Sequence, residues 1–184
     1  MANQDEKQIL KQLHQVKFGE HTVLVLPDIY ALRNAYARFS KKRLEHNEAI
    51  MIIAYYDTVS GVKHYLRELD VDVEKHLKTG SLIIIDGLAE FNQSETSFLQ
   101  RLAMIGDSVK TTGKEGISVI MDMGLFFHGH NNDLFEFEQS MARQADFVCK
   151  CLLCCYNAAD FGRLSEPAQR DLAALHHKKI MVSG

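Results

Sequence analysis

Residues 21–34, HTVLVLPDIYALRN, decide the fold of this chain of 184 residues. The first six, His21–Leu26, are almost all apolar and include three β-branched side chains, which is typical of a strand buried on both faces. Pro27 and Asp28 end this strand, and Asp28 can cap a following helix. One apolar face of that helix would be formed by Ile29, Leu32, Tyr36 and Phe39. The stretch therefore predicts a buried strand that leads directly into an amphipathic helix.

The same alternation continues along the chain. Buried strands are predicted at 49–54, 81–85, 117–121 and 147–156, with a short strand at 179–182. Helices are predicted at about 4–17, from Thr58 or Ser60, from Ser94, at about 132–144 and from Ser165. Strands that are apolar on both faces and alternate with helices indicate a mostly parallel sheet covered on both sides. We therefore expect one three-layer α/β domain over residues 1–184.

The composition excludes several classes of function. The chain has 21 Lys and Arg against 24 Asp and Glu, a net charge of −3, which gives no general attraction to nucleic acid or to an anionic membrane. No run of about 20 apolar residues could span a bilayer. The N-terminus is polar and lacks the basic start and apolar stretch of a signal peptide. We expect a cytoplasmic protein with no direct contact to nucleic acid or membrane.

The turn after the first strand bears on nucleotide binding. A phosphate-binding loop has the pattern Gly-x-x-x-x-Gly-Lys-Ser/Thr, in which backbone N–H groups cradle the phosphates. Residues 27–34 contain neither glycine nor lysine, although the chain has 11 glycines elsewhere. Asp28 would also repel a phosphate. The sequence therefore argues against ATP hydrolysis, and no catalytic residue and no cofactor are predicted.

Polar and aromatic residues follow the predicted strands, at the edge where open α/β sheets bind ligands. The candidate ligand-binding residues there are Asp28, Tyr30, Tyr56, Asp57, Asp122, Phe126 and His128. Tyr55 and Tyr56 would point to opposite faces, so only one is expected to face a crevice. The simpler alternative is that each Asp caps the helix after its strand.

Two further groups of residues raise the question of metal or redox chemistry. Cys149, Cys151, Cys154 and Cys155 are too close together for a disulfide framework, and we expect buried core thiols, with Cys154 facing the opposite side from the other three. Redox sensing and metal binding are the alternatives. The pair His128 and His130, with Asp133 or Glu136, could bind zinc or iron. A solvated loop is the default interpretation, and no metal site is predicted.

The ordered set of these features resembles one sensory-domain family. The chain carries His21 at the start of its first strand, Asp122-Met123, Glu138 in Phe-Glu-Phe-Glu, Cys154-Cys155-Tyr156-Asn157, and Leu175-His176 before a last apolar strand. This pattern is similar to the MEDS domain, named for methanogens, methylotrophs and the dichloromethane repressor DcmR, and covers about residues 15–182. The resemblance implies a RecA/KaiC-like fold with a degenerate nucleotide site, and it adds Glu138 to the candidate ligand-binding residues.

The resemblance also implies a function. It implies a non-catalytic domain that binds a small molecule, such as a one-carbon or hydrocarbon-type compound, in signal transduction or transcriptional regulation. In the family the domain is often joined to a DNA-binding domain or a histidine kinase, so at this length we expect action through a protein partner or self-association. The alternative is a degenerate KaiC-like regulator that still binds nucleotide or oligomerises.

Overall fold

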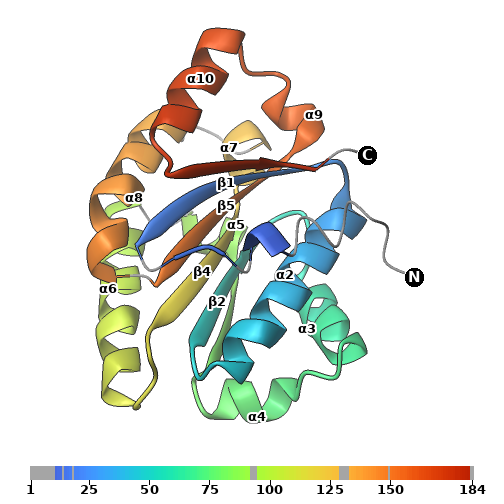
Figure 1. The fold of residues 1–184 in the computed structure, drawn as a ribbon, viewed down its shortest axis with the longest axis vertical. Coiled ribbons are helices and arrows are strands. Elements are labelled where there is room, and N and C mark those ends of the chain that lie inside the picture. The colour runs from blue at the N-terminus through green and yellow to red at the C-terminus, as the bar shows by residue number, and fades with distance from the viewer. Residues whose placement is uncertain are drawn as a thin grey trace.

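The fold is built on one parallel six-stranded sheet (Figure 1). The computed structural model describes residues 11–13, 15–17, 19–91, 95–128, 133–148 and 150–182. The strands are β1 (Glu20–Leu26), β2 (Ala49–Ala54), β3 (Leu82–Asp86), β4 (Ile117–Asp122), β5 (Cys151–Asn157) and β6 (Lys178–Met181). Their order is β3-β2-β4-β5-β1-β6, and every neighbouring pair is parallel.

Helices cover both faces of the sheet, which confirms the predicted three-layer α/β class. One face carries α2 (Ile29–Glu45), α3 (Val59–Glu68) and α4 (Val73–Lys78). The other carries α6 (Glu95–Thr111), α7 (Leu125–His128), α8 (Leu134–Val148), α9 (Ala158–Phe161) and α10 (Glu166–Ala174). A short helix, α5 (Gly87–Phe91), follows β3. Because all strands are parallel, their carboxyl ends meet at one edge of the sheet.

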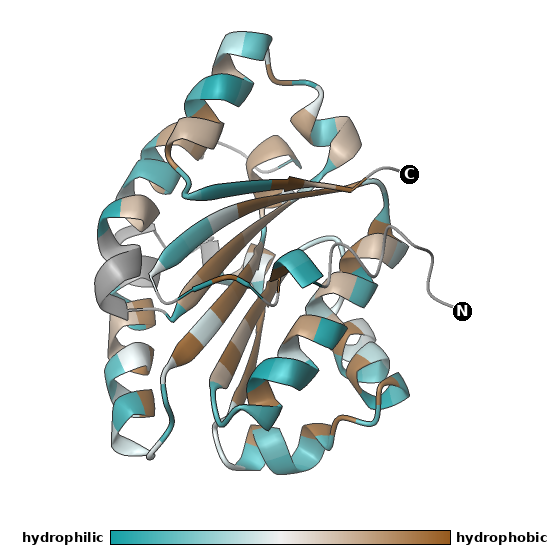
Figure 2. Ribbon diagram, in the orientation of Figure 1, coloured by the Kyte–Doolittle hydropathy of each residue, from teal (hydrophilic) through white to brown (hydrophobic). Residues whose placement is uncertain are grey.

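Two hydrophobic clusters form the core, one on each face. The strands between them are mostly hydrophobic, as the brown ribbons of the sheet in Figure 2 show. Alternation along β1 divides its side chains, because Leu24 and Leu26 pack under α2 whereas Val23 and Val25 pack on the opposite face. Each fully buried Val or Leu contributes about 1.5–3 kcal/mol relative to an exposed one. Burial on both faces explains why the strand sequences are continuous apolar runs.

Three local predictions need correction or fall outside the described residues. The strand predicted from Phe147 begins at Cys151, because α8 continues to Val148. The helices α4, α5, α7 and α9 were not predicted, since each has only four to six residues. Of the helix predicted at about 4–17, residues 1–10 lie outside the described part, while 11–13 are helical. No described helix is long and apolar enough to cross a membrane.

Candidate functional site

A cavity of about 360 Å³ lies at the carboxyl ends of β1, β4 and β5, beside the start of α2. Its walls are Leu26, Asp28, Ile29, Leu32, Arg33, Tyr56, Asp122, Cys155, Tyr156 and Asn157. The cavity therefore sits where open α/β sheets bind their ligands. Three of the predicted residues, Asp28, Tyr56 and Asp122, line it. Tyr55 packs against the cluster on the other face of the sheet, as the strand alternation predicted.

The carboxylate of Asp122 holds two turns together at the cavity. Its Oδ2 accepts hydrogen bonds from the N–H groups of Tyr55 (3.2 Å) and Tyr56 (2.7 Å), and its Oδ1 accepts from Gly124 N–H (3.0 Å). Burial raises the pKa of Asp122 to about 7, although the hydrogen bonds from Gly124 and Tyr55 oppose this rise. Asp122 therefore shapes the cavity wall by fixing the backbone around it.

The start of α2 is unsuited to binding a phosphate. Asp28 is the N-cap of this helix, and its Oδ1 accepts a hydrogen bond from Ala31 N–H at 2.8 Å. An anion bound at a helix N-terminus would use such N–H groups. Because the Asp28 carboxylate already occupies this end of α2, a phosphate there would meet a negative charge. Asn157 caps α9 in the same way, through Ala159 N–H.

Arg33 and Asp57 form an ion pair next to the cavity. The Nε and Nη2 atoms of Arg33 donate to the two oxygens of Asp57 at 2.8 and 3.1 Å, and Tyr36 donates its hydroxyl to Oδ2 at 2.8 Å. Burial alone would raise the pKa of Asp57, but the hydrogen bonds from Arg33, Tyr36 and Thr58 N–H hold it below its ordinary value. Asp57 therefore fixes the Arg33 side chain at the cavity wall instead of lining the cavity itself.

Three other predicted residues lie elsewhere. Tyr30, in the first turn of α2, is 63% exposed, and Phe126 packs against Phe137 with ring centroids 4.9 Å apart. His128 is half-exposed, and its Nε2 lies 3.1 Å from Asp160 Oδ2. His130 lies outside the described residues. Asp133, which was considered with it as a metal ligand, caps α8 through Phe135 and Glu136 N–H.

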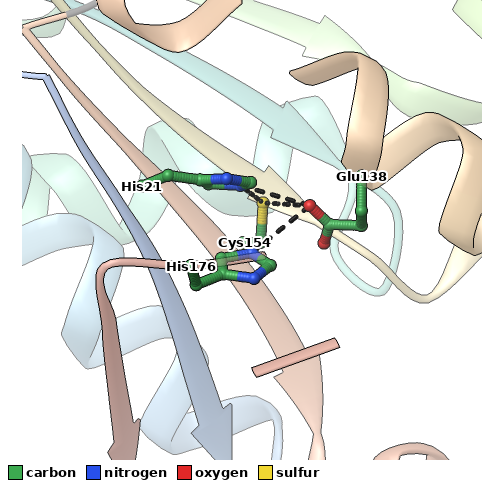
Figure 3. A group of neighbouring side chains, drawn as sticks. All are labelled: His21, Glu138, Cys154 and His176. Atoms are coloured by element: carbon green, nitrogen blue, oxygen red, sulfur yellow. Dashed lines mark hydrogen bonds and ion pairs between the residues drawn. The ribbon is translucent and has the colours of Figure 1, made fainter. Parts of the chain in front are cut away.

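Glu138, the last predicted residue, belongs to a different place: a buried cluster with His21, Cys154 and His176 (Figure 3). Its Oε2 lies 3.1 Å from His21 Nε2, 3.3 Å from His176 Nε2 and 3.6 Å from Cys154 Sγ. The Nε2 of His21 also lies 3.1 Å from Cys154 Sγ. These residues come from β1, α8, β5 and the turn after α10, and their side chains are fully buried.

The surroundings of Glu138 favour its ionised form. Burial alone would raise its pKa, but the two imidazole rings outweigh burial and hold the pKa at about 2. Burial also lowers the pKa of His21. The second oxygen of Glu138, Oε1, accepts a hydrogen bond from the hydroxyl of Tyr156, which lines the cavity. Tyr156 thus belongs to the walls of the cavity and to the surroundings of the cluster.

The cysteines divide as the strand alternation predicted. Cys151 and Cys155 pack under α2, whereas Cys154 faces α8 on the other side, and all three are buried. Burial raises the pKa of the Cys151 thiol to about 11 and that of Cys155 further. High pKa values and burial are typical of inert core thiols. Cys149 lies outside the described residues.

Some functional residues were missed from the sequence. Arg33 was not among the predicted residues, and its salt bridge with Asp57 spans 24 residues. His21 and His176 appeared only as matching positions in the family pattern. They meet because β6 pairs with β1, which brings the turn after α10 to the start of β1. The proximity of His21 and His176 can be predicted only when the strand order is known.

Comparisons with known proteins agree with this architecture. The model of a family described as MEDS, the MEthanogen/methylotroph, DcmR Sensory domain, matches residues 20–177. No curated protein matches the sequence with significance. The flagellar accessory protein FlaH from Methanocaldococcus jannaschii superposes with a TM-score of 0.66 at 13% identity, over 97% of this chain and 78% of that one. The KaiC-like protein PH0186 from Pyrococcus horikoshii OT3 gives a TM-score of 0.69 at 14% identity, over 89% and 72%. The RecA/KaiC-like fold is thereby confirmed.

Proposed function

Because this chain belongs to the MEDS family of sensory domains, we propose that it binds a small molecule in the cavity at the carboxyl edge of its sheet. The cavity is the observation that carries this proposal. Its volume of about 360 Å³ is at the small end of the range of about 300–1,000 Å³ found for ligand pockets. A binding event there changes the surroundings of three strand ends, of Tyr56 after β2 and of α2, which a protein partner or a second copy of the chain could recognise.

The cavity walls favour a ligand with a largely apolar body. Leu26, Ile29, Leu32 and Cys155 supply apolar surface. Several polar groups are already engaged, since Asp122 accepts three backbone N–H groups and Arg33 is held by Asp57. Recognition would therefore rest mainly on contact with apolar surface. This supports the compound class that the family resemblance implies, a one-carbon or hydrocarbon-type molecule, and it supports a role in sensing without catalysis.

Nucleotide binding is the alternative that the fold suggests. It would require the phosphates to approach the N-terminus of α2, where Asp28 accepts from Ala31 N–H. Calorimetric titration with ATP and Mg²⁺ is expected to give no binding heat. Binding in the micromolar range would overturn this part of the proposal and favour a degenerate KaiC-like regulator.

The sensor proposal is tested by filling the cavity. Ile29→Trp places a large side chain at its wall, and Lys42→Trp makes the same change in the last turn of α2, away from the cavity. Both variants and the wild type would be titrated calorimetrically with dichloromethane, methanol, methylamine and 1-propanol as probes. We expect at least one probe to bind the wild type and Lys42→Trp, and to bind Ile29→Trp at least about tenfold more weakly. Equal binding to both variants would place the ligand elsewhere, and no binding by any probe would contradict the proposed ligand class.

A further inference from the structure

The buried cluster of His21, Glu138, Cys154 and His176 combines the side chains that bind transition metals in proteins. It offers two imidazole nitrogens, one carboxylate oxygen and one sulfur, and these four atoms lie within 4.8 Å of one another. Figure 3 shows the four side chains converging from separate elements on one point. Nothing in the sensor proposal uses this cluster, because the cavity lies at the carboxyl ends of the strands.

One contact in the cluster is unfavourable as it stands. The Nδ1 atom of His176 lies 2.8 Å from the carbonyl oxygen of Leu172, which can only accept a hydrogen bond, so Nδ1 carries the proton. In the neutral ring the Nε2 atom then presents a lone pair. This atom lies 3.3 Å from the Glu138 carboxylate, is buried, and makes no hydrogen bond with any described residue. With a neutral ring, two electron-rich atoms thus face each other, and either a proton on Nε2 or a metal ion between them would make the contact favourable.

We propose that this cluster is a binding site for a divalent transition metal, with Zn²⁺ as the best match, coordinated by His21 Nε2, His176 Nε2, Glu138 Oε2 and Cys154 Sγ. With metal–ligand bonds of about 2.0–2.3 Å, a tetrahedral zinc site separates its ligand atoms by about 3.3–3.8 Å. Four of the six separations, at 3.1, 3.1, 3.3 and 3.6 Å, come within a few tenths of an ångström of that spacing, and all six lie within 4.8 Å. A shift of the ligand atoms by a few tenths of an ångström to about one ångström would accommodate the ion.

The charges of the cluster also fit a divalent ion. Zn²⁺ binds cysteine as the thiolate, so binding breaks the S–H bond of Cys154 and releases its proton to solvent. The thiolate and the Glu138 carboxylate together carry two negative charges, and two neutral imidazoles carry none. The loaded site is therefore neutral, which a completely buried position requires. A mixed set of nitrogen, oxygen and sulfur ligands favours zinc over the hard cations Mg²⁺ and Ca²⁺.

Groups around the cluster orient its ligands, as in known metal sites. The Leu172 carbonyl fixes the tautomer of His176, and the Tyr156 hydroxyl binds Glu138 Oε1, which leaves Oε2 toward the cluster centre. The backbone of His21 is tied to the same turn, because its N–H donates to His177 Nδ1 at 3.0 Å and its carbonyl accepts from His177 N–H at 2.8 Å. Four protein ligands and full burial describe a closed site that joins β1, α8, β5 and the turn before β6.

Cobalt substitution can identify the site through its sulfur ligand. The test uses the tag-free, full-length chain, stripped of metal and titrated with Co²⁺, with Cys154→Ser and the matched control Cys151→Ser. Cys151 lies in the same strand and is buried on the opposite face of the sheet. We expect one Co²⁺ per chain in the wild type and in Cys151→Ser, with a thiolate-to-cobalt charge-transfer band and the strong visible bands of a four-coordinate ion. In Cys154→Ser the charge-transfer band should be lost and Zn²⁺ affinity should fall more than tenfold.

A second measurement guards against a Cys154→Ser variant that does not fold. The melting temperature of metal-free wild type should rise on addition of one equivalent of Zn²⁺, because the ion binds only the folded chain. Tyr156→Phe, which removes the hydrogen bond to Glu138, should weaken Zn²⁺ binding by about 10–100-fold. A melting temperature that does not respond to Zn²⁺, or a charge-transfer band that survives in Cys154→Ser, would overturn the proposal. The first result would indicate that His176 is held as an imidazolium paired with Glu138.

Discussion

The cavity at the carboxyl edge and the buried cluster beneath α8 use polar side chains in opposite ways. At the cavity, Asp28 caps α2 and Asp122 fixes two turns, so the carboxylates serve the backbone next to them. In the cluster, Glu138 faces two imidazole rings and a sulfur atom from distant parts of the chain. Bonds from carboxylates to backbone N–H groups shape the first region, and the convergence of side chains from four elements creates the second.

The cavity can admit a ligand, whereas the cluster is closed to solvent. The cavity has room for a molecule and few uncommitted charges, as a sensor of weakly polar compounds would need. The cluster has no exposed side chain and a set of ligands that point at one another. Tyr156 is common to both, since it lines the cavity and donates to Glu138. Changes in the cluster should therefore affect stability strongly, and changes at the cavity should affect binding.

The largest expected effect comes from Glu138→Gln in the cluster. Replacing this buried carboxylate leaves the cation that the cluster holds, a proton on an imidazole or a metal ion, without its charged partner, and breaking a buried ionic pair costs about 3–5 kcal/mol of unfolding free energy. Urea denaturation followed by circular dichroism measures this loss. Glu74→Gln is the control, because Glu74 pairs with Arg67 at the surface and its replacement should have no measurable effect. Similar losses of unfolding free energy in both variants would contradict a special contribution of the buried cluster to stability.

Gly124→Ala should damage the cavity more than the cluster. A Cβ at this position would lie 2.5 Å from Cε2 of Tyr56 and 2.8 Å from Cδ1 of Tyr55, so the Tyr56 ring must move at the cavity wall. Overpacking of this kind costs about 1–3 kcal/mol. We expect binding of any probe to weaken more than tenfold while Co²⁺ binding is retained. Gly162→Ala, with its nearest contact at 3.2 Å, is the control, and unchanged probe binding in Gly124→Ala would argue against a ligand at Tyr56.

Two substitutions of Asp28 distinguish the loss of its capping hydrogen bond from the loss of its negative charge. Asp28→Ala removes the acceptor for Ala31 N–H and should cost about 1 kcal/mol, whereas Asp28→Asn keeps a good cap and should cost much less. Thermal unfolding measures both. If removal of the charge in Asp28→Asn also produces ATP binding, the fold retains a latent nucleotide site; we expect none, because residues 27–34 still lack glycine and lysine.

The smallest effect concerns Asp57 and depends on pH. Its pKa in the folded chain is lowered, so the unfolded chain takes up the proton first. The stability that this pair contributes is complete above the ordinary pKa of 3.8 and is lost as the pH falls through the lower folded value. Asp57→Asn should therefore be less stable at neutral pH and lose less stability on acidification. Asp107→Asn, at an exposed pair, should follow the wild type. If the unfolding free energy of Asp57→Asn fell with decreasing pH as steeply as that of the wild type, this assignment would be contradicted.

The sequence predicted the four inner strands well because they are buried on both faces. The strand at Ala49–Ala54 was predicted with its observed bounds, and the opposite orientation of Cys154 and Cys155 follows from the period of a strand. The end of α8 was misplaced, since Phe147 and Val148 are also good strand residues and continue the apolar run into β5.

The candidate site was predicted only in part, for a physical reason. Residues at strand ends, such as Asp28 and Asp122, can be found because a parallel sheet brings all its carboxyl ends to one edge. The meeting of His21 with His176 depends on the position of β6 at the sheet edge beside β1. No local pattern encodes that neighbourhood, so the cluster became visible only in three dimensions.

The sensor proposal is tested most directly by mapping probe binding onto backbone amides. A ¹H–¹⁵N correlation spectrum would be recorded during titration with dichloromethane, methanol, methylamine and 1-propanol, one at a time. The account predicts that a binding probe shifts the amides of residues 28–33 and of Tyr56 and Asn157, which surround the cavity, and leaves those near His176 in place. Shifts confined to residues away from the cavity, or no shift with any probe, would contradict it.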